Sequence, residues 1–493
     1  MIKYGQDIPT GTELSTQVCV VGSGAAGVTL AWYLQKAGKK VILIDGSRDM
    51  PNDPYEDKIL LYNGEATGLF KNNEPEFLIR PTSAYQYGPW ERERTYGGTT
   101  THWGGQSRPL DPITFEGVPG YTGWPVTRKD LDLYFDEAVE YCKLASTNFE
   151  ADYWAKVLGA EVPRLNGFNT EMYQFMGNID SNLDFAKRKV NGQTIGDTSV
   201  EVIRNASLLT IEHDNGSANR LHVASISSSG NPPTIETEFY IKADAYVLAT
   251  GAVANARQLL LSEIDNDNIG RYFMCHPLVA SYLDGGPNPV TITGNYLNYS
   301  EQRLMDGNDQ NGMQWKDENG VTVQGRFIPN EEKTREFDIG RCWFWANGGS
   351  MYFEQAPNKE SRITLSENTD KVFGQRQTHI NWEFNDLDEK TYKIVTRLFR
   401  KAVKDINNNA DVNFVSWENI KSRAVVNGHH LGTTRMSDSP EDGVVDKNLR
   451  SHDVDNLYVA GSSVWPSAGI SNPTFTIITF SIRLAKHLIN KVL

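Results

Sequence analysis

One short segment near the start of the chain constrains the fold more than any other feature. Residues 17–21, Gln-Val-Cys-Val-Val, form an apolar run rich in β-branched side chains, which is typical of a buried parallel strand. The glycine pattern Gly22-Ser-Gly24-Ala-Ala-Gly27 follows at once and leads into a helical stretch. A second apolar strand, residues 40–44, stops at Asp45, close to the spacing of roughly 20 residues that the dinucleotide-binding fingerprint requires.

Each residue of this fingerprint has a physical reason. Gly22 permits a tight turn, Gly24 lets the backbone approach a pyrophosphate, and Gly27 lets the helix pack closely on the strand. The start of the helix offers free N–H groups and the positive end of its dipole to phosphates, while Asp45 can accept hydrogen bonds from a ribose diol. The alternative is an ordinary turn between a strand and a helix, and the pattern alone does not distinguish FAD from NAD.

Composition limits the class of protein further. The chain has 493 residues, 39% of them hydrophobic and 11% aromatic, so we expect two folded domains. No stretch approaches the roughly 18 consecutive apolar residues of a membrane span, and no export signal is apparent at the start, which favours a cytoplasmic protein. A net charge of −14 without a basic cluster argues against nucleic acid or an anionic membrane as a partner. The four cysteines lack C-x-x-C spacing, so we expect reduced thiols and no metal site.

Hydrophobic periodicity predicts further elements along the chain. One amphipathic helix is expected at residues 130–145, where Thr127 and Asp130 can form a capping box. Residues 286–425 are polar and rich in asparagine, glycine and aromatic side chains, which suits an antiparallel sheet that covers a ligand cleft. The remaining strand-like runs are residues 199–203, 207–212, 221–226, 245–251 and 456–460, and the remaining helices are residues 254–261 and 472–491.

Several segments occur in an order that resembles a known family. Besides the glycine fingerprint, they are Tyr96-Gly-Gly-Thr-Thr-Thr-His-Trp103, Val247-Leu-Ala-Thr-Gly-Ala252, Gly270-Arg-Tyr-Phe-Met-Cys-His-Pro277, Gly428-His-His-Leu-Gly-Thr-Thr-Arg-Met436 and residues 456–474. Together they resemble the glucose–methanol–choline (GMC) oxidoreductases, in particular the branch of pyranose-oxidase-like enzymes and FAD-dependent sugar dehydrogenases. The resemblance implies FAD rather than NAD.

The resemblance also implies a fold and a division into domains. The expected class is α/β (α+β overall), with a Rossmann-like FAD-binding domain interrupted by a substrate domain on a mainly antiparallel sheet. The FAD-binding domain would comprise residues 1–110, 196–285 and 426–493. The substrate-binding domain would comprise residues 111–195 and 286–425.

Candidate site residues follow from the same resemblance. His429 corresponds to the active-site histidine of the family, and Asn472 corresponds to a second catalytic position, where some members have His and the pyranose-oxidase branch has Asn. His102 matches the histidine that carries the covalent flavin in pyranose oxidases, but Gly104 stands where fungal pyranose oxidases have Thr, so a covalent link stays open. His430 is a candidate substrate contact, and a one-residue misalignment would exchange it with His429. The other implied FAD contacts, besides the fingerprint residues with Ala25 and Ala26, are Gly98, Thr99, Trp103, Ala249, Thr250, Gly251, Gly461, Ser462, Asn472, Pro473 and Thr474.

The chemistry of alcohol oxidation suits these residue types. It requires the removal of a hydroxyl proton and of a hydride from carbon, and the neutral imidazole of His429 can take the proton because the ordinary pKa of histidine is about 6.5. The amide of Asn472 can donate and accept, so it can hold the hydroxyl in line. The helix that starts at Asn472–Pro473 would stabilise a reduced flavin if its positive end points there. His276, before Pro277, is predicted to be a loop or packing residue.

The sequence thus predicts an FAD-dependent oxidoreductase that oxidises an alcohol with hydride transfer to flavin N5. The expected substrate is a secondary ring hydroxyl, at C2 or C3, of a sugar, glycoside or similar polyol. Oxygen or a quinone-type carrier would accept the electrons, and an oligomer is possible. The alternatives are a dehydrogenase of a non-sugar alcohol that passes electrons to a quinone or other carrier, a non-catalytic flavin-binding subunit, and an NAD-dependent dehydrogenase.

Overall fold

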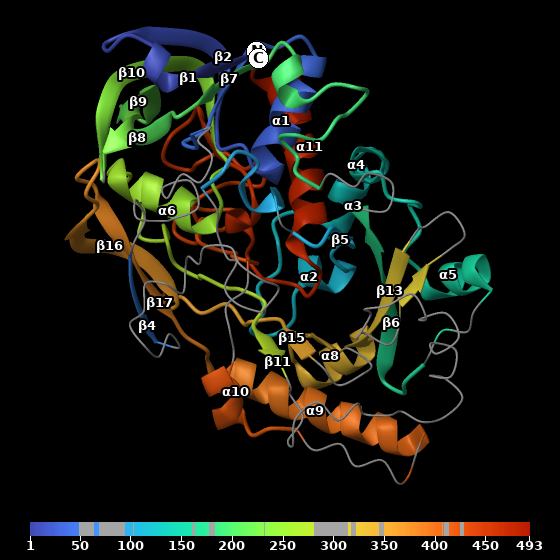
Figure 1. Ribbon diagram of the computed structural model, residues 1–493. Coiled ribbons are helices and arrows are strands. Elements are labelled where there is room, and N and C mark those ends of the chain that lie inside the picture. The colour runs from blue at the N-terminus through green and yellow to red at the C-terminus, as the bar shows by residue number, and fades with distance from the viewer. Residues whose placement is uncertain are drawn as a thin grey trace.

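The computed structural model describes residues 1–48, 64–68, 94–101, 103–159, 162, 164–176, 183–230, 232–280, 314–316, 322–344, 350–406, 408, 414–423 and 428–493. Two large sheets lie at opposite ends of the molecule (Figure 1). One is built on β2 (Glu13–Val21) and β10 (Pro233–Leu248), and the other on β6 (Phe168–Phe175) and β13 (Thr322–Pro329). Helices and strands of both parts make up one mixed α/β architecture, which confirms the predicted fold class.

The first sheet carries the glycine fingerprint. Besides β2 and β10, its strands are β1 (Ile2–Tyr4), β3 (Val41–Ile44), β7 (Glu201–Arg204), β8 (Ser207–Asp214), β9 (Ser217–Gly230) and β18 (Leu457–Val459). Among the described residues its order is β1-β7-β3-β2-β10-β9-β8, and β18 also pairs with β10. β2 runs parallel to β3 and β10, and β10 runs parallel to β18, whereas β8, β9 and β10 are antiparallel neighbours. The C-terminal ends of β2, β10 and β18 therefore meet at one edge of the sheet.

Local sequence explains how helices follow these strands. α1 (Ala25–Lys36) starts directly after Gly24, and Gly38 follows its end with φ +75°, the left-handed conformation in which helices commonly terminate. α6 (Ala252–Leu261) follows β10, and α11 (Pro473–Lys491) begins with the predicted proline in its first turn. α1 and α11 pack side by side (Figure 1).

The predicted amphipathic helix at residues 130–145 is wrong in its extent. Two helices occupy that stretch, α3 (Arg128–Asp132) and α4 (Phe135–Cys142). The predicted capping box is confirmed, because the backbone N–H of Thr127 donates to Asp130 Oδ2 at 2.7 Å and the Thr127 side chain accepts from the Asp130 backbone. The helix breaks because Tyr134, with φ −115° and ψ 3°, leaves helical geometry.

The second sheet is antiparallel throughout its described pairs. Besides β6 and β13, its strands are β5 (Gln106–Ser107), β11 (Leu278–Ala280), β12 (Gln314–Lys316), β14 (Cys342–Phe344) and β15 (Ser350–Phe353). The long helix α9 (Asp386–Ile406) packs against it, with Phe399 stacked on Phe344 at 4.3 Å between ring centroids (Figure 1). β5 and β11 come from segments that the resemblance places in the FAD-binding domain, and the domain boundaries themselves stay predictions. The shorter helices are α2 (Pro112–Glu116), α5 (Ala151–Leu158), α8 (Glu331–Phe337) and α10 (Trp417–Arg423).

A third, small sheet departs from the expected antiparallel pattern. Its strands are β16 (Arg362–Thr369), β17 (Arg376–Trp382) and β4 (Gly64–Gly68). β16 and β17 are antiparallel, as predicted for residues 286–425, but β17 and β4 are parallel. The parallel pair arises because β4 comes from the distant N-terminal part of the chain rather than from a hairpin.

Three properties concern the described chain as a whole. Within the described ranges, no helix is both long enough and apolar enough to cross a bilayer. Cys19, Cys142, Cys275 and Cys342 are free and buried. Among the same described residues, no group of three or more His, Cys, Asp or Glu side chains is arranged to hold a metal ion.

Candidate active site

The glycine turn after β2 is closely packed on one side and open on the other. A Cβ atom on Gly27 would lie 1.9 Å from the carbonyl oxygen of Gly22, and one on Gly22, at φ +105°, would lie 2.6 Å from that of Ala249. A Cβ on Gly24 would meet no atom within 4 Å. Gly27 therefore lets α1 pack closely on the turn, and Gly22 lets the segment after β10 do the same. The space beside Gly24 stays open, as the approach of a pyrophosphate requires.

Asp45 fastens this turn to its surroundings. Its Oδ2 accepts hydrogen bonds from the backbone N–H of Ser23 at 3.1 Å and from the Ser23 hydroxyl at 2.5 Å, and its Oδ1 accepts from the Ser47 N–H at 2.9 Å. The N–H of Gly97 in turn donates to Ser23 Oγ at 2.9 Å. Asp45 thus organises the glycine turn, and its predicted contact with a ribose stays a prediction.

A second glycine-rich opening lies where β10 and β18 end. Gly251 and Gly461 have φ values of +85° and +107°, and a Cβ on either would meet no atom within 4 Å. The buried side chain of Asn255 joins the two segments, since its Oδ1 accepts from the Thr250 N–H at 2.9 Å and its Nδ2 donates to the Ala460 carbonyl at 3.1 Å. Sequence reasoning missed Asn255, because one polar residue in an apolar helix gives no sign of what it bridges.

The other predicted FAD contacts surround these turns. Ala25 and Ala26 form the buried first turn of α1, and a Cβ on Gly98 would lie 3.4 Å from the Cα of Gly24. Trp103 donates from its indole N–H to the Leu183 carbonyl at 3.1 Å, which fixes the ring. Three of the predicted contacts are partly exposed, namely Thr99, Thr250 and Thr474. Three others are buried, namely Ala249, Ser462 and Pro473. His102, the candidate for a covalent link, lies outside the described residues.

The two predicted catalytic side chains meet. Asn472 Nδ2 lies 3.4 Å from His429 Nε2, and both residues are partly exposed. Asn472 occupies the N-cap position of α11, but its side chain makes no capping hydrogen bond and contacts His429 instead. His430 points elsewhere: its ring packs on Phe273 at 5.5 Å between centroids, which places His429 rather than His430 beside Asn472.

His276 lies buried in a loop, as predicted, and it also contacts the predicted catalytic histidine. Its Nδ1 lies 3.0 Å from His429 Nδ1, and its Nε2 lies 2.8 Å from the carbonyl oxygen of Gly469. A carbonyl only accepts, so Nε2 of His276 carries the hydrogen and the neutral ring presents a lone pair at Nδ1. That lone pair accepts the Nδ1–H of His429, which leaves His429 Nε2 unprotonated and facing Asn472.

The electrostatic surroundings keep both imidazoles neutral. Burial lowers the pKa of His276 to about 4. Burial also holds the pKa of His429 well below the usual 6.5, and the neighbouring His276, His430 and Arg326 lower that pKa further. His429 is therefore neutral at neutral pH, which is the state that a general base requires.

Arg326 on β13 is a further residue of the site that sequence reasoning missed. It is completely buried, and its Nη1 donates to Asn472 Oδ1 at 3.3 Å. Its guanidinium carbon lies 4.0 Å from the ring centroid of Tyr173 and 3.9 Å from that of Trp343. Trp343 stacks on Tyr352, whose ring lies 6.0 Å from that of His429. The only sequence signal was a lone arginine in an otherwise strand-like run.

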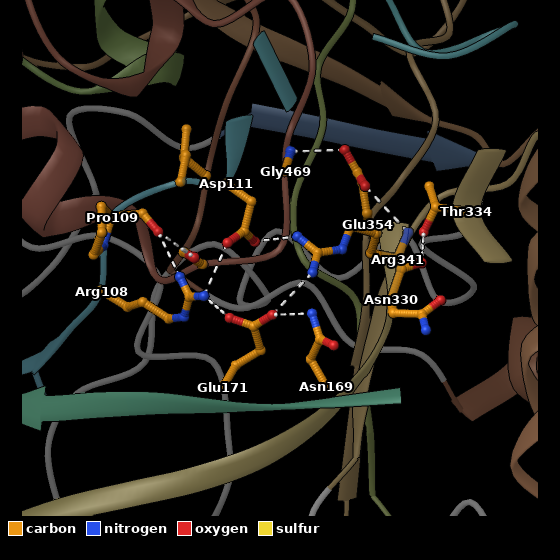
Figure 2. A network of polar contacts seen from close by, with 12 residues as sticks. Arg108, Pro109, Asp111, Asn169, Glu171, Asn330, Thr334, Arg341, Glu354 and Gly469 are labelled. Carbon is orange, nitrogen blue, oxygen red and sulfur yellow. Dashed lines mark hydrogen bonds and ion pairs between the residues drawn. The ribbon is translucent and has the colours of Figure 1, made fainter. Parts of the chain in front are cut away.

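A network of buried charged side chains lies next to Gly469, whose carbonyl binds His276 (Figure 2). Arg108 and Arg341 both pair with Asp111 and with Glu171, which joins β6 to the loop before α2. Glu354 accepts hydrogen bonds from the backbone N–H groups of Arg341 at 3.1 Å and Gly469 at 2.8 Å. Burial raises the pKa of Glu354 to about 7. Because the Gly469 carbonyl binds His276, this network positions the histidine pair.

The fold and the site together define a class of protein. A Rossmann-like sheet presents glycine turns with room for a dinucleotide, and α11 of the same part brings an amide to an unprotonated imidazole, which is the arrangement of a dinucleotide-dependent oxidoreductase. A family model described as GMC oxidoreductase matches residues 357–481, and one described as pyridine nucleotide-disulphide oxidoreductase matches residues 16–294. The chain belongs to the GMC oxidoreductase family and is an FAD-dependent enzyme of the alcohol- and sugar-oxidising type. FAD replaces the NAD alternative.

Known relatives cover the chain to different extents. The fructose dehydrogenase large subunit of Gluconobacter japonicus is 22% identical, and the alignment covers 97% of this chain and 98% of the relative. The 2-methyl-1,2-propanediol dehydrogenase of Mycolicibacterium austroafricanum is 30% identical over 28% of this chain and 24% of its own length. Among solved structures, an FAD-dependent oxidoreductase from Chaetomium thermophilum has a TM-score of 0.58 at 14% identity, covering 96% of this chain and 98% of that one, which shows a shared fold.

Proposed function

We propose that this enzyme oxidises a secondary hydroxyl of a sugar or related polyol, at C2 or C3 of a pyranose, to a ketone. The observation that carries the proposal is the 3.4 Å approach of Asn472 Nδ2 to an unprotonated His429 Nε2. The end-to-end similarity to a fructose dehydrogenase subunit supports a sugar substrate. The partly exposed ring of Tyr352 beside His429 also supports it, since aromatic side chains can pack against the apolar parts of sugar rings.

Residues of this chain remove the hydroxyl proton and orient the hydroxyl oxygen. His429 Nε2 takes the hydroxyl proton, and Asn472 Nδ2 donates to the substrate oxygen and holds it in line. The positive charge that forms on His429 is shared through its Nδ1–H with the neutral Nδ1 of His276. When bound, FAD would accept the hydride from the carbon that carries this hydroxyl.

The glycine turn after β2 and the glycine-rich opening after β10 and β18 would hold the cofactor. The glycine turn at Gly22, Gly24 and Gly27 suits the pyrophosphate at the start of α1, and the open glycines Gly251 and Gly461 leave room along the same edge of the sheet. The first turn of α11 would face the flavin ring and stabilise its reduced, negatively charged form.

The test is anaerobic reduction of the flavin by a panel of sugars, glycosides and simple diols. We expect His429→Ala to retain the yellow flavin and to be reduced about 10²–10⁴-fold more slowly, because it lacks the base. His452→Ala, which removes an imidazole that contacts Ser437, is the matched control and should behave as the wild type. Full activity of His429→Ala would contradict the proposed role.

The same panel tests the alternatives. Reduction by diols but not by sugars would favour a non-sugar alcohol, in keeping with the local similarity to a 2-methyl-1,2-propanediol dehydrogenase. Reduction by no alcohol at all would indicate a flavin-binding subunit. Admission of oxygen after reduction then separates the acceptors, since rapid return of the yellow colour indicates an oxidase and lasting bleaching indicates a dehydrogenase.

A further inference from the structure

Gln106, the first residue of β5, is a second carboxamide beside Asn472. Its Oε1 accepts a hydrogen bond from Nη2 of the buried Arg326. The same guanidinium donates from Nη1 to Asn472 Oδ1 at 3.3 Å, and from Nη2 to Gln324 Oε1 at 2.8 Å. Arg326 therefore holds the side chains of Asn472 and Gln106 next to each other, on neighbouring nitrogens of one planar group.

Arg326 determines which end of each carboxamide it leaves available. A guanidinium has only N–H donors, so it turns both oxygens toward itself and leaves both amide NH₂ groups for other partners. The NH₂ group of Asn472 faces His429 Nε2 at 3.4 Å. The NH₂ group of Gln106 makes no hydrogen bond with any residue that the structure describes. The two side chains thus offer two oriented amide donors, and the one on Gln106 has no acceptor within the described chain.

The space beside the amide nitrogen of Gln106 is open. Gln106 is partly exposed, and Gly104, two residues before it, is exposed. A Cβ atom on Gly104 would lie 3.8 Å from Gln106 Nε2 and, apart from its chain neighbours, would meet no other described residue within 4 Å. Gln324, the third carboxamide on Arg326, is only 1% exposed. Asn472 and Gln106 are therefore the two amides on this arginine that lie partly at the surface.

We propose that Gln106 determines specificity, because its Nε2 donates a hydrogen bond to an oxygen on the carbon next to the one that is oxidised. The inference rests on the proposed function, since it takes His429 and Asn472 as the residues that bind the reacting hydroxyl. Two oxygens on adjacent carbons can meet both amide donors at once. An alcohol without the second oxygen leaves the Gln106 donor without an acceptor in the complex, so vicinal diols are preferred over isolated alcohols.

The experiment compares two cyclohexanols of matched shape. trans-2-Methoxycyclohexanol has an ether oxygen where trans-2-ethylcyclohexanol has a methylene group, so only the first offers an acceptor next to its hydroxyl. The rate constant of anaerobic flavin reduction divided by the substrate Kd is measured for each with the holoenzyme. We expect the methoxy compound to exceed the ethyl compound by about five- to tenfold, the effect of one neutral hydrogen bond. Equal values for the two compounds would overturn the proposal.

Variants assign the preference to Gln106. Gln106→Leu should reduce the ratio of methoxy to ethyl compound to about one. Gln106→Glu still accepts from Arg326 but has no N–H, so it should lose the preference for the ether and keep one for trans-1,2-cyclohexanediol over cyclohexanol, because the second hydroxyl of the diol can donate to the carboxylate. Gln193→Leu, which removes an exposed glutamine that contacts Asp197, is the matched control and should leave both ratios unchanged. If Gln106→Leu slows both compounds equally and their ratio stays as in the wild type, Gln106 acts only by holding Arg326, and the proposal is wrong.

A binding measurement keeps the proposal testable without turnover. The corresponding ketones, 2-methoxycyclohexanone and 2-ethylcyclohexanone, are titrated into the oxidised holoenzyme while the flavin absorbance is followed. We expect the Kd of the methoxy ketone to be about fivefold lower in the wild type, and the two Kd values to be equal in Gln106→Leu. Equal Kd values in the wild type, or no saturable change with either ketone, overturn the proposal. If no alcohol reduces the flavin, the proposed function fails, whereas this titration still decides the role of Gln106.

Discussion

His276 offers the sharpest test of how the base is prepared. In His276→Leu the Nδ1–H of His429 loses its acceptor at 3.0 Å, and the Gly469 carbonyl loses its donor at 2.8 Å. A buried donor without a partner costs about 1–3 kcal/mol, and His429 can escape this cost by moving its hydrogen to Nε2. The tautomer that results cannot accept the substrate proton.

The size of the effect follows from that free energy. Because 1.36 kcal/mol corresponds to a factor of ten, a penalty of about 1.4–2.8 kcal/mol lowers the rate of flavin reduction about 10- to 10²-fold. The assay is anaerobic stopped-flow reduction over a range of substrate concentrations. We expect the limiting rate to fall while the substrate Kd and the flavin content stay within about twofold of the wild type, since His276 acts through His429.

His276→Asn is the variant that separates positioning from packing. Its side-chain oxygen can take the place of the Nδ1 lone pair, so it should restore the rate to within about fivefold of the wild type, although it has less volume than leucine. If His276→Leu reduces its flavin at the wild-type rate, or if His276→Asn is as slow as His276→Leu, the inferred tautomer of His429 is wrong.

Three further predictions concern the fold and its charges. Gly27→Ala places a Cβ 1.9 Å from the Gly22 carbonyl oxygen and should lower the free energy of unfolding, measured by denaturant titration, by about 3 kcal/mol. Gly24→Ala places a Cβ in open space, so the apoprotein should keep its stability while its affinity for FAD falls. Asn472→Ala should slow flavin reduction at least tenfold and change the unfolding free energy by less than the ~1 kcal/mol of a lost helix cap, because its side chain caps nothing. Burial raises the pKa of Glu354 to about 7, so the folded state binds more protons than the unfolded one between about pH 4.5 and 7, and Glu354 alone should lower stability by about 3 kcal/mol as pH rises through that window. Burial also raises the pKa of Asp388 to about 7, so Glu354→Gln should reduce the slope measured in unfolding at each pH and leave the part that Asp388 contributes.

The parts of the fold that sequence predicts are those specified by neighbours along the chain. The strand, glycine turn, helix and second strand up to Asp45 depend on local contacts, and so do the capping box at Thr127 and the proline-led start of α11. The extent of the helix at residues 130–145 was not predictable in this way. The backbone leaves helical geometry at Tyr134, and the spacing of the apolar residues on either side does not record that change.

The residues of the site also divide into those that the sequence predicts and those that it does not. His429 and Asn472 could be proposed because each belongs to a motif that names it. His276 and Arg326 could not, since their partners lie 153 and 146 residues away along the chain and their residue types fit a packed loop and an ordinary strand. What distinguishes them is a partner that only the folded chain provides: a carbonyl for His276 and an amide for Arg326.

Those two partners specify the same state of the base from opposite directions. The Gly469 carbonyl can only accept, which fixes the hydrogen of His276 on Nε2 and that of His429 on Nδ1. Arg326 can only donate, which turns Oδ1 of Asn472 toward the guanidinium and its Nδ2 toward His429 Nε2. An amide N–H facing Nε2 requires a lone pair there, and the first chain of hydrogen bonds leaves one. Because neither constraint depends on the other, a change at either end disturbs the base without touching it.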